Sequence, residues 1–408
     1  MRLPDIGIIA RRSFIAGVLS LCAATSVAAK PADWIASWAA PPAPPLLVAP
    51  SFWPTAPLTP APDNQTIVQV VRLSAGGHRL CIRLSNEFGT APLTVGTVRV
   101  APLSPDGKAD ESKARAVTFS GAMHAVVPPH APLVSDPIDL ATAPLSRIRI
   151  SIYLPAATGP ATAHFQAAAT AEISPAGDYT DRPFTPAATA PMRLFLTEVD
   201  VQRERRGPVV VTLGDSITDG VGSTDDADHR WPDVLAERLA PAGGAVVNAG
   251  IGGNQVLQDA AVTAWGQGAL ARLDRDVLAV PGATHLVVLE GINDITSSSG
   301  LTADALIAGY RQIIDRAHAH GLKVVLGTIL PVKHSWMFTP QNEALRASVN
   351  AWILSQHESD GVVDFDAAVR DPADPSSMRK ALQSGDWIHP NDLGYRTMGE
   401  AVDLKVFR

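Results

Sequence analysis

Cysteine is scarce in this chain: only Cys22 and Cys81 occur among its 408 residues. Cys22 falls within a predicted N-terminal leader, so the processed chain would keep one thiol and could not form an internal disulfide. No cluster of cysteine and histidine has the spacing of zinc ligands. The sequence therefore excludes two classes of protein, the disulfide-rich scaffold and the structural zinc domain.

Long basic blocks and long apolar runs are also missing. The formal net charge is −7, and contacts to phosphates dominate affinity for nucleic acids, so a nucleic-acid-binding protein is excluded. Beyond residue 30 no segment reaches the ~18 consecutive apolar residues of a membrane-spanning helix, and we expect no integral membrane segment in the mature chain. Aromatic residues make up only 5%, so the core is expected to consist mainly of Ala, Val, Leu and Ile.

Residues 1–29 have the composition of an export signal. Arg11 and Arg12 precede an apolar run from Ile15 to Val27 that is too short to span a bilayer, and small residues follow it. The paired arginines favour the twin-arginine route, while the Sec route stays open. We expect an exported protein that is periplasmic or extracellular.

Proline divides the remaining chain, because only nine of the 34 prolines follow Gly207. Residues 30–62 are expected to form a Pro/Ala-rich extended arm, since proline fixes φ and lacks a backbone donor. Residues 63–200 contain short runs of alternating apolar residues, such as 147–154, between loops rich in proline and glycine. This pattern predicts an all-β sandwich domain with a jelly-roll-like arrangement. Whether it binds glycan or only flanks the next domain stays open.

Residues 207–408 show a different pattern, in which continuous apolar runs alternate with helical stretches. The apolar runs, which predict strands buried on both faces, are 209–213, 245–248, 285–289, 323–330 and 362–365. The alternation predicts an α/β domain with a parallel, doubly wound sheet. In such a sheet the functional loops follow the carboxyl ends of the strands.

Polar residues suited to acyl transfer follow these strands. Ser216 comes after the first, Gly252 lies in a glycine-rich loop after the second, and Asn293 follows the third. Asp386 and His389 stand near the C-terminus, three residues apart. Together they could supply a nucleophile, a base, an orienting carboxylate and oxyanion donors.

Each of these residue types matches a chemical requirement. A serine hydroxyl is a weak nucleophile until a base such as His389 removes its proton. The Asp386 carboxylate is close enough in sequence to fix the imidazole tautomer. Backbone N–H groups of Ser216 and Gly252 and the side-chain amide of Asn293 could stabilise the oxyanion of a tetrahedral intermediate.

Four segments resemble, in order, the sequence blocks of the SGNH (GDSL-type) hydrolase superfamily. They are Gly-Asp-Ser at 214–216, the glycine at 252, Gly-x-Asn-Asp at 291–294 and Asp-x-x-His at 386–389. The resemblance covers about residues 207–408. It implies a flavodoxin-like three-layer α/β/α fold and the hydrolysis of carboxylic esters without a metal or cofactor.

The resemblance also implies a role for each matched residue. Ser216 would be the nucleophile and first oxyanion donor, with Gly252 and Asn293 as further donors. His389 would be the base and Asp386 its partner.

The β-rich first half and residues 220–232 resemble secreted members grouped with acetylxylan-type carbohydrate esterases. We therefore expect an esterase that removes short acyl groups, chiefly acetyl, from polysaccharide or oligosaccharide. A broad GDSL lipase or arylesterase acting on small or lipid esters is the alternative, followed by a non-catalytic carbohydrate-binding protein. The sequence predicts no oligomeric state.

Overall fold

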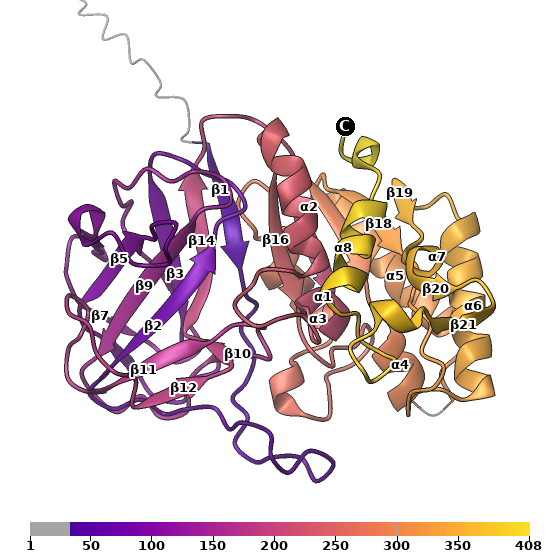
Figure 1. The fold of residues 1–408 in the computed structure, drawn as a ribbon, viewed down its shortest axis with the longest axis horizontal. Helices are drawn as coiled ribbons and strands as arrows, with labels where there is room; N and C mark the ends of the chain where they lie inside the picture. Colours follow the sequence, from indigo (N-terminus) through magenta and orange to yellow (C-terminus); the bar gives the residue numbers. More distant parts are fainter. Residues whose placement is uncertain (1–32, 299) are drawn as a thin grey trace, which may run out of the picture. The chain divides into compact units, whose positions relative to one another are not determined.

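The computed structural model of the chain describes residues 33–298 and 300–408 (Figure 1). The predicted export signal at residues 1–29 lies outside the described residues. No helix in the described part of the chain is long and apolar enough to cross a membrane.

The first half consists of antiparallel strands in two larger sheets and two strand pairs. The four-stranded sheet has the order β1-β14-β3-β8, formed by Trp34–Ala39, Leu196–Gln202, Leu80–Ser85 and Pro132–Val134. The six-stranded sheet has the order β12-β11-β2-β9-β5-β6, formed by Ala188–Ala190, Ala171–Ala176, Gln65–Arg72, Arg147–Leu154, Val98–Pro102 and Arg115–Ala116. The pairs are β10 (Ala163–Phe165) with β13 (Met192–Leu194), and β4 (Leu93–Val95) with β7 (Ala125–Val127).

Side-chain alternation explains how these sheets bury one face. On β9, Ile148, Ile150 and Ile152 are fully buried, and β2 pairs with this strand along its whole length. Their side chains share one apolar core with residues of the four-stranded sheet, including Ile35 and Ile82. The two larger sheets therefore enclose a common core.

Strand β1 lies within the segment expected to be an extended arm. Its sequence, Trp-Ile-Ala-Ser-Trp-Ala, contains no proline and pairs antiparallel with β14. The proline-rich residues begin only after this strand. The prediction of a wholly extended arm over residues 30–62 therefore missed a strand.

The second half contains a five-stranded parallel sheet with the order β16-β15-β17-β18-β19. The strands in chain order are β15 (Val209–Gly214), β16 (Ala245–Gly250), β17 (His285–Leu289), β18 (Lys323–Gly327) and β19 (Gly361–Val363). The prediction of a parallel sheet is confirmed, and its strand order is the flavodoxin-like one. The last two strands are shorter than expected: β18 ends at Gly327, and β19 ends at Val363 because Asp364 already caps α7, which begins at Phe365.

Helices cover both faces of this sheet (Figure 1). On one face pack α2 (Trp231–Leu239), α7 (Phe365–Val369) and α8 (Asp392–Ala401), together with Val210 of β15. On the other face pack α3 (Ala269–Leu273), α5 (Ala303–Ala319) and α6 (Pro340–Ser355), together with Val211 and Leu213. Successive residues of β15 thus face different helix layers, which explains its continuous apolar sequence.

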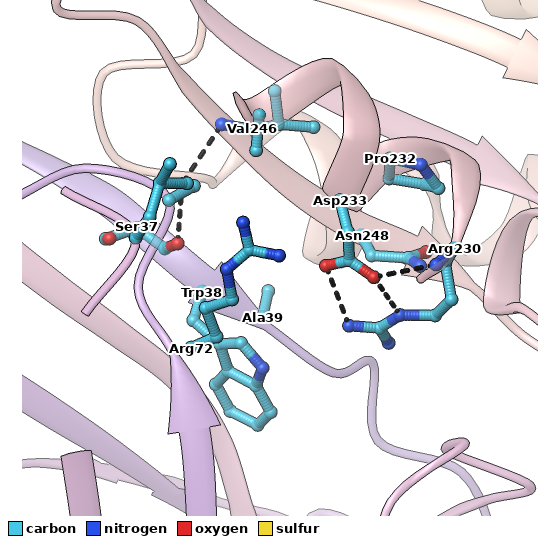
Figure 2. Close-up of a pocket in the computed structure, with 12 residues that line it drawn as sticks. Ser37, Trp38, Ala39, Arg72, Arg230, Pro232, Asp233, Val246 and Asn248 are labelled. Carbon is cyan, nitrogen blue, oxygen red and sulfur yellow. Dashed lines mark hydrogen bonds and ion pairs between the residues drawn. The ribbon is translucent and has the colours of Figure 1, made fainter. Parts of the chain in front are cut away.

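Polar contacts join the two halves beside α2. The Arg72 guanidinium forms an ion pair with Glu237 at 2.9 Å, and the Val246 N–H donates to the Ser74 hydroxyl at 3.1 Å. Figure 2 shows the small cavity at this junction, where Arg72 lies near the Arg230–Asp233 ion pair at the start of α2. Arg72, Arg230 and Asp233 are the charged residues among the twelve that line the cavity, and none of the predicted catalytic side chains lines it.

Candidate active site

Ser216 begins the short helix α1 (Ser216–Asp219), directly after β15. Asp215 is the N-cap, and its carboxylate accepts a hydrogen bond from the Ile217 N–H at 2.9 Å. The Ser216 N–H is in the first turn, where no helical carbonyl can reach it. The strand-to-helix turn thus presents both the hydroxyl and a backbone donor of the same serine.

The three residues predicted to form a catalytic triad lie in one hydrogen-bonded row. His389 Nε2 is 2.8 Å from Ser216 Oγ, and His389 Nδ1 is 2.6 Å from Asp386 Oδ2. The other oxygen of Asp386 accepts the backbone N–H groups of Ile388 and His389, both at 2.9 Å. With Nδ1 donating to the carboxylate, Nε2 is left to accept the serine proton.

The environment of Asp386 keeps its carboxyl group ionised. Burial alone would raise its pKa, but the hydrogen bond and charge of His389 and the two backbone donors outweigh burial and hold the pKa below its usual range. An ionised Asp386 next to the ring can stabilise positive charge that develops on the imidazole during proton transfer.

Asn293 lies at the start of α4 (Ile292–Ser297), after β17, and is 7% exposed. Its side-chain nitrogen donates to the Asn254 carbonyl at 2.9 Å, which uses one of the two amide hydrogens and leaves the other for a ligand. The neighbouring Asp294 accepts the Val256 and Leu257 N–H groups at 2.8 and 3.0 Å. Asp294 therefore orders the loop that Asn293 contacts.

The geometry around Gly252 differs from the prediction that its N–H is an oxyanion donor. This N–H donates to Asp219 Oδ2 at 2.9 Å, so it already has an acceptor. Within residues 33–298 and 300–408, the N–H of the next residue, Gly253, has no acceptor. Gly253 has φ +75, and a Cβ there would lie 2.3 Å from the Trp265 ring, so only glycine fits. The geometry therefore favours Gly253 over Gly252 as the donor.

One residue that the sequence analysis missed connects these loops. Arg272 is fully buried and donates to the carbonyls of Gly214 (3.1 Å) and Ala249 (2.7 Å), at the ends of β15 and β16. Its Nε donates to Asn254 Oδ1 at 2.9 Å. The Arg272 guanidinium therefore fixes the positions of two turns relative to each other. They are the serine turn (residues 214–216), which follows β15, and the glycine turn (residues 251–254), which follows β16.

A signal for Arg272 was present in the sequence. Buried positions in this segment recur at helical spacing, and Arg272 and Asp276 occupy the same face as the apolar Ala269, Leu273 and Val277. Two charged residues on the apolar face of a helix require buried partners. The identity of those partners depends on the fold.

No group of three His, Cys, Asp or Glu side chains in the described part of the chain is arranged to hold a metal ion. The site as built contains a serine hydroxyl, an imidazole–carboxylate pair and N–H donors. Such a set can carry out acyl transfer through a covalent intermediate.

The second half of the chain has an α/β fold with a parallel sheet, and its site groups a serine hydroxyl with an imidazole and a carboxylate. Residues 212–397 match the model of the GDSL-like Lipase/Acylhydrolase family. This region is a GDSL-like acylhydrolase domain with the SGNH hydrolase fold, and the protein is a carboxylic ester hydrolase.

Solved structures that resemble the chain do so over about half of its length. The aryl esterase of M. smegmatis is 18% identical, with a TM-score of 0.39, over 48% of this chain and 95% of its own. Est24, a carbohydrate acetylesterase from Sinorhizobium meliloti, is 17% identical, with a TM-score of 0.39, over 49% and 98%. A putative acylhydrolase from Bacteroides fragilis is 22% identical, with a TM-score of 0.37, over 50% and 90%. No curated protein matches the chain.

The buried Asp215 carboxyl predicts a pH-dependent stability. Burial raises its pKa to about 7, whereas in the unfolded chain it has the ordinary value of about 4. The folded state therefore holds this proton more tightly, and the free energy of unfolding decreases as pH rises from about 4 to about 7. Asp215→Asn keeps an acceptor for the Ile217 N–H but carries no charge, so we expect a smaller decrease.

Urea denaturation of both proteins at about pH 5 and about pH 8 measures this difference. Other groups that titrate in this range are common to both proteins and cancel in the comparison. An equal decrease in the variant and the wild type would contradict the prediction.

Proposed function

We propose that this esterase cleaves short-chain carboxylic esters with Ser216 as nucleophile, His389 as general base and Asp386 as the residue that orients His389. The observation that carries the proposal is the continuous row of hydrogen bonds from Ser216 Oγ through the imidazole to the Asp386 carboxylate. These residues are separated by up to 173 positions in the chain and meet only in the folded protein.

The proposed reaction has two steps. His389 Nε2 takes the Ser216 proton as Oγ attacks the ester carbonyl, and the intermediate collapses when His389 returns the proton to the leaving alcohol. Water then attacks the acyl-serine with the same histidine as base, which releases the carboxylic acid and restores the serine hydroxyl. The N–H groups of Ser216 and Gly253 and the second amide hydrogen of Asn293 are the proposed oxyanion donors.

A cavity beside the serine loop supports a small ester. It has a volume of about 260 Å³ and borders residues 220–223, which follow α1. Trp53, Pro57 and Pro191 supply an apolar wall from the first half of the chain. Pockets that enclose drug-sized ligands have roughly 300–1,000 Å³, so this cavity has room for a short acyl group or a small alcohol next to the serine loop, and its lining does not include Ser216, His389 or Asn293.

The polysaccharide part of the proposal rests on the resemblance to acetylxylan-type esterases and on the predicted export signal at residues 1–29. Export would bring the enzyme to glycans that lie outside the cytoplasm. We therefore propose O-acetyl groups of polysaccharide or oligosaccharide as the substrate.

A chain-length series tests the substrate class. We expect faster hydrolysis of p-nitrophenyl acetate and butyrate than of the C12 ester, and release of acetate from acetylated xylan, both unaffected by EDTA. Faster hydrolysis of the C12 ester would favour the lipase alternative. Absence of hydrolysis with every ester would favour a carbohydrate-binding protein.

A further inference from the structure

The first half of the chain places a buried histidine against the serine helix. His164 on β10 is 4% exposed, and its Nε2 lies 3.0 Å from Asp219 Oδ1. Asp219 is 1% exposed and ends α1, three residues after Ser216. The contact therefore reaches from the antiparallel half into the helix that carries the proposed nucleophile.

The Asp219 carboxylate also binds the glycine turn. Asp219 Oδ2 accepts the Gly252 N–H at 2.9 Å, and the Asn254 N–H donates to the Ile251 carbonyl at 3.1 Å to close the turn around Gly252 and Gly253. His164, Asp219 and Gly252 thus form one unbroken row of hydrogen bonds. The row ends one residue before the free N–H of Gly253.

We propose that His164 is a positioning residue for ester hydrolysis: through Asp219 it holds the glycine turn so that the Gly253 N–H faces the reacting carbonyl. The inference rests on the proposed function, because it assigns a task to the oxyanion donors. It also gives the antiparallel half a role in catalysis, as a part of the active site.

The two acceptors around His164 define how the ring binds. Its Nδ1 lies 2.9 Å from the Pro41 carbonyl, which can only accept, so Nδ1 donates there, while Nε2 contacts the Asp219 carboxylate. Both ring nitrogens therefore have a partner at a buried position. Displacing the ring would leave these buried polar groups unsatisfied, so the two contacts hold its geometry.

A second side chain from the same segment contacts the turn. Gln166, two residues after His164, has φ +58, and its Oε1 would lie 2.8 Å from a Cβ at Gly252. Gln166 also lines the cavity next to the serine loop. Gln166 therefore lies directly beside the turn, while His164 reaches it through Asp219.

Two substitutions of similar polarity distinguish the contact of His164 with Asp219 from its contact with Pro41. A glutamine amide can occupy the place of Nε2 and donate to Asp219, whereas an asparagine amide can replace only Nδ1 and donate to Pro41. We expect kcat of His164→Asn to fall about 10-fold to 100-fold with KM nearly unchanged, which is less than the loss for a deleted oxyanion donor. We expect His164→Gln to keep kcat within about 3-fold of wild type.

Glu237→Gln is the matched control, because it removes the Arg72–Glu237 ion pair that joins the two halves far from the predicted catalytic side chains. We expect wild-type kcat for this control. Equal activities of His164→Asn and His164→Gln, or an unchanged kcat in His164→Asn, would overturn the inference. If His164→Asn does not fold, Asp219→Ala tests the same row from its centre, and the same loss of kcat is expected.

Labelling by a serine-directed phosphonate distinguishes this inference from the proposed function. Its phosphoryl oxygen occupies the position of the oxyanion, so slower labelling of Ser216 in His164→Asn than in His164→Gln supports the positioning role. Labelling of Ser216 at equal rates would overturn this inference alone. Labelling of a different residue would overturn the proposed function itself.

Discussion

Replacement of Ser216 with alanine is expected to abolish esterase activity and leave the fold intact. Within residues 33–298 and 300–408, the Ser216 hydroxyl has His389 as its only side-chain partner, and the backbone contacts of Ser216 within α1 do not depend on the hydroxyl. Without a nucleophile the reaction loses its covalent step, and kcat should fall about 10⁴-fold to 10⁶-fold. Turnover of p-nitrophenyl acetate measures the loss of activity, and the melting temperature of the same preparation shows whether the fold is intact.

Ser146→Ala is the matched control for this prediction. The Ser146 hydroxyl lies in the turn before β9 and donates to the Ala143 carbonyl at 2.7 Å instead of contacting His389. We expect activity near that of the wild type, with a loss of stability of about 1 kcal/mol from the missing hydrogen bond. Substantial turnover by Ser216→Ala would remove this residue from the mechanism.

Replacement of Asn293 should give the second-largest loss of activity. The proposed role of Asn293 as an oxyanion donor is exerted mainly in the transition state, so Asn293→Ala should lower kcat about 10²-fold to 10³-fold, or roughly 3–4 kcal/mol, with little change in KM. Asn293→Asp keeps the shape but places a negative charge next to the oxyanion and the Asn254 carbonyl. It should be at least as damaging.

Asn350→Ala distinguishes catalysis from stability in this test. Asn350 is also 7% exposed, and its side chain binds both the N–H and the carbonyl of Ile329. We expect its loss to lower the melting temperature and leave kcat unchanged. Near wild-type kcat in Asn293→Asp would show that this side chain does not face the reacting carbonyl.

The features that the sequence predicted well depend on short-range patterns. Runs such as 209–213 are apolar except for the buried Thr212 because both faces of β15 are covered by helices, and this requirement is visible in the sequence itself. The spacing of Asp386 and His389 is also local, since a turn of three residues suffices to bring the carboxylate to Nδ1. The parallel sheet and this pair could therefore be derived before the structure.

The glycine turn shows where local patterns stop being informative. Gly252 and Gly253 are adjacent and identical, so the sequence cannot tell which N–H is free. The difference arises because Asp219, distant in the chain, occupies the first of them. Likewise, the strand Trp34–Ala39 could be recognised only with its partner β14 in view, because a short run next to many prolines has no distinctive pattern of its own.

The sequence by itself determined the parallel sheet, the order of the chemically active segments along it and the types of side chain that they carry. Only the tertiary structure decided that Arg272 joins two strand ends, that His164 reaches Asp219 and which glycine N–H is free. The physical reason is the range of the interactions. Hydrophobic periodicity and turn propensity act between near neighbours in the chain, whereas the partner of a buried donor is chosen by packing between segments far apart in sequence.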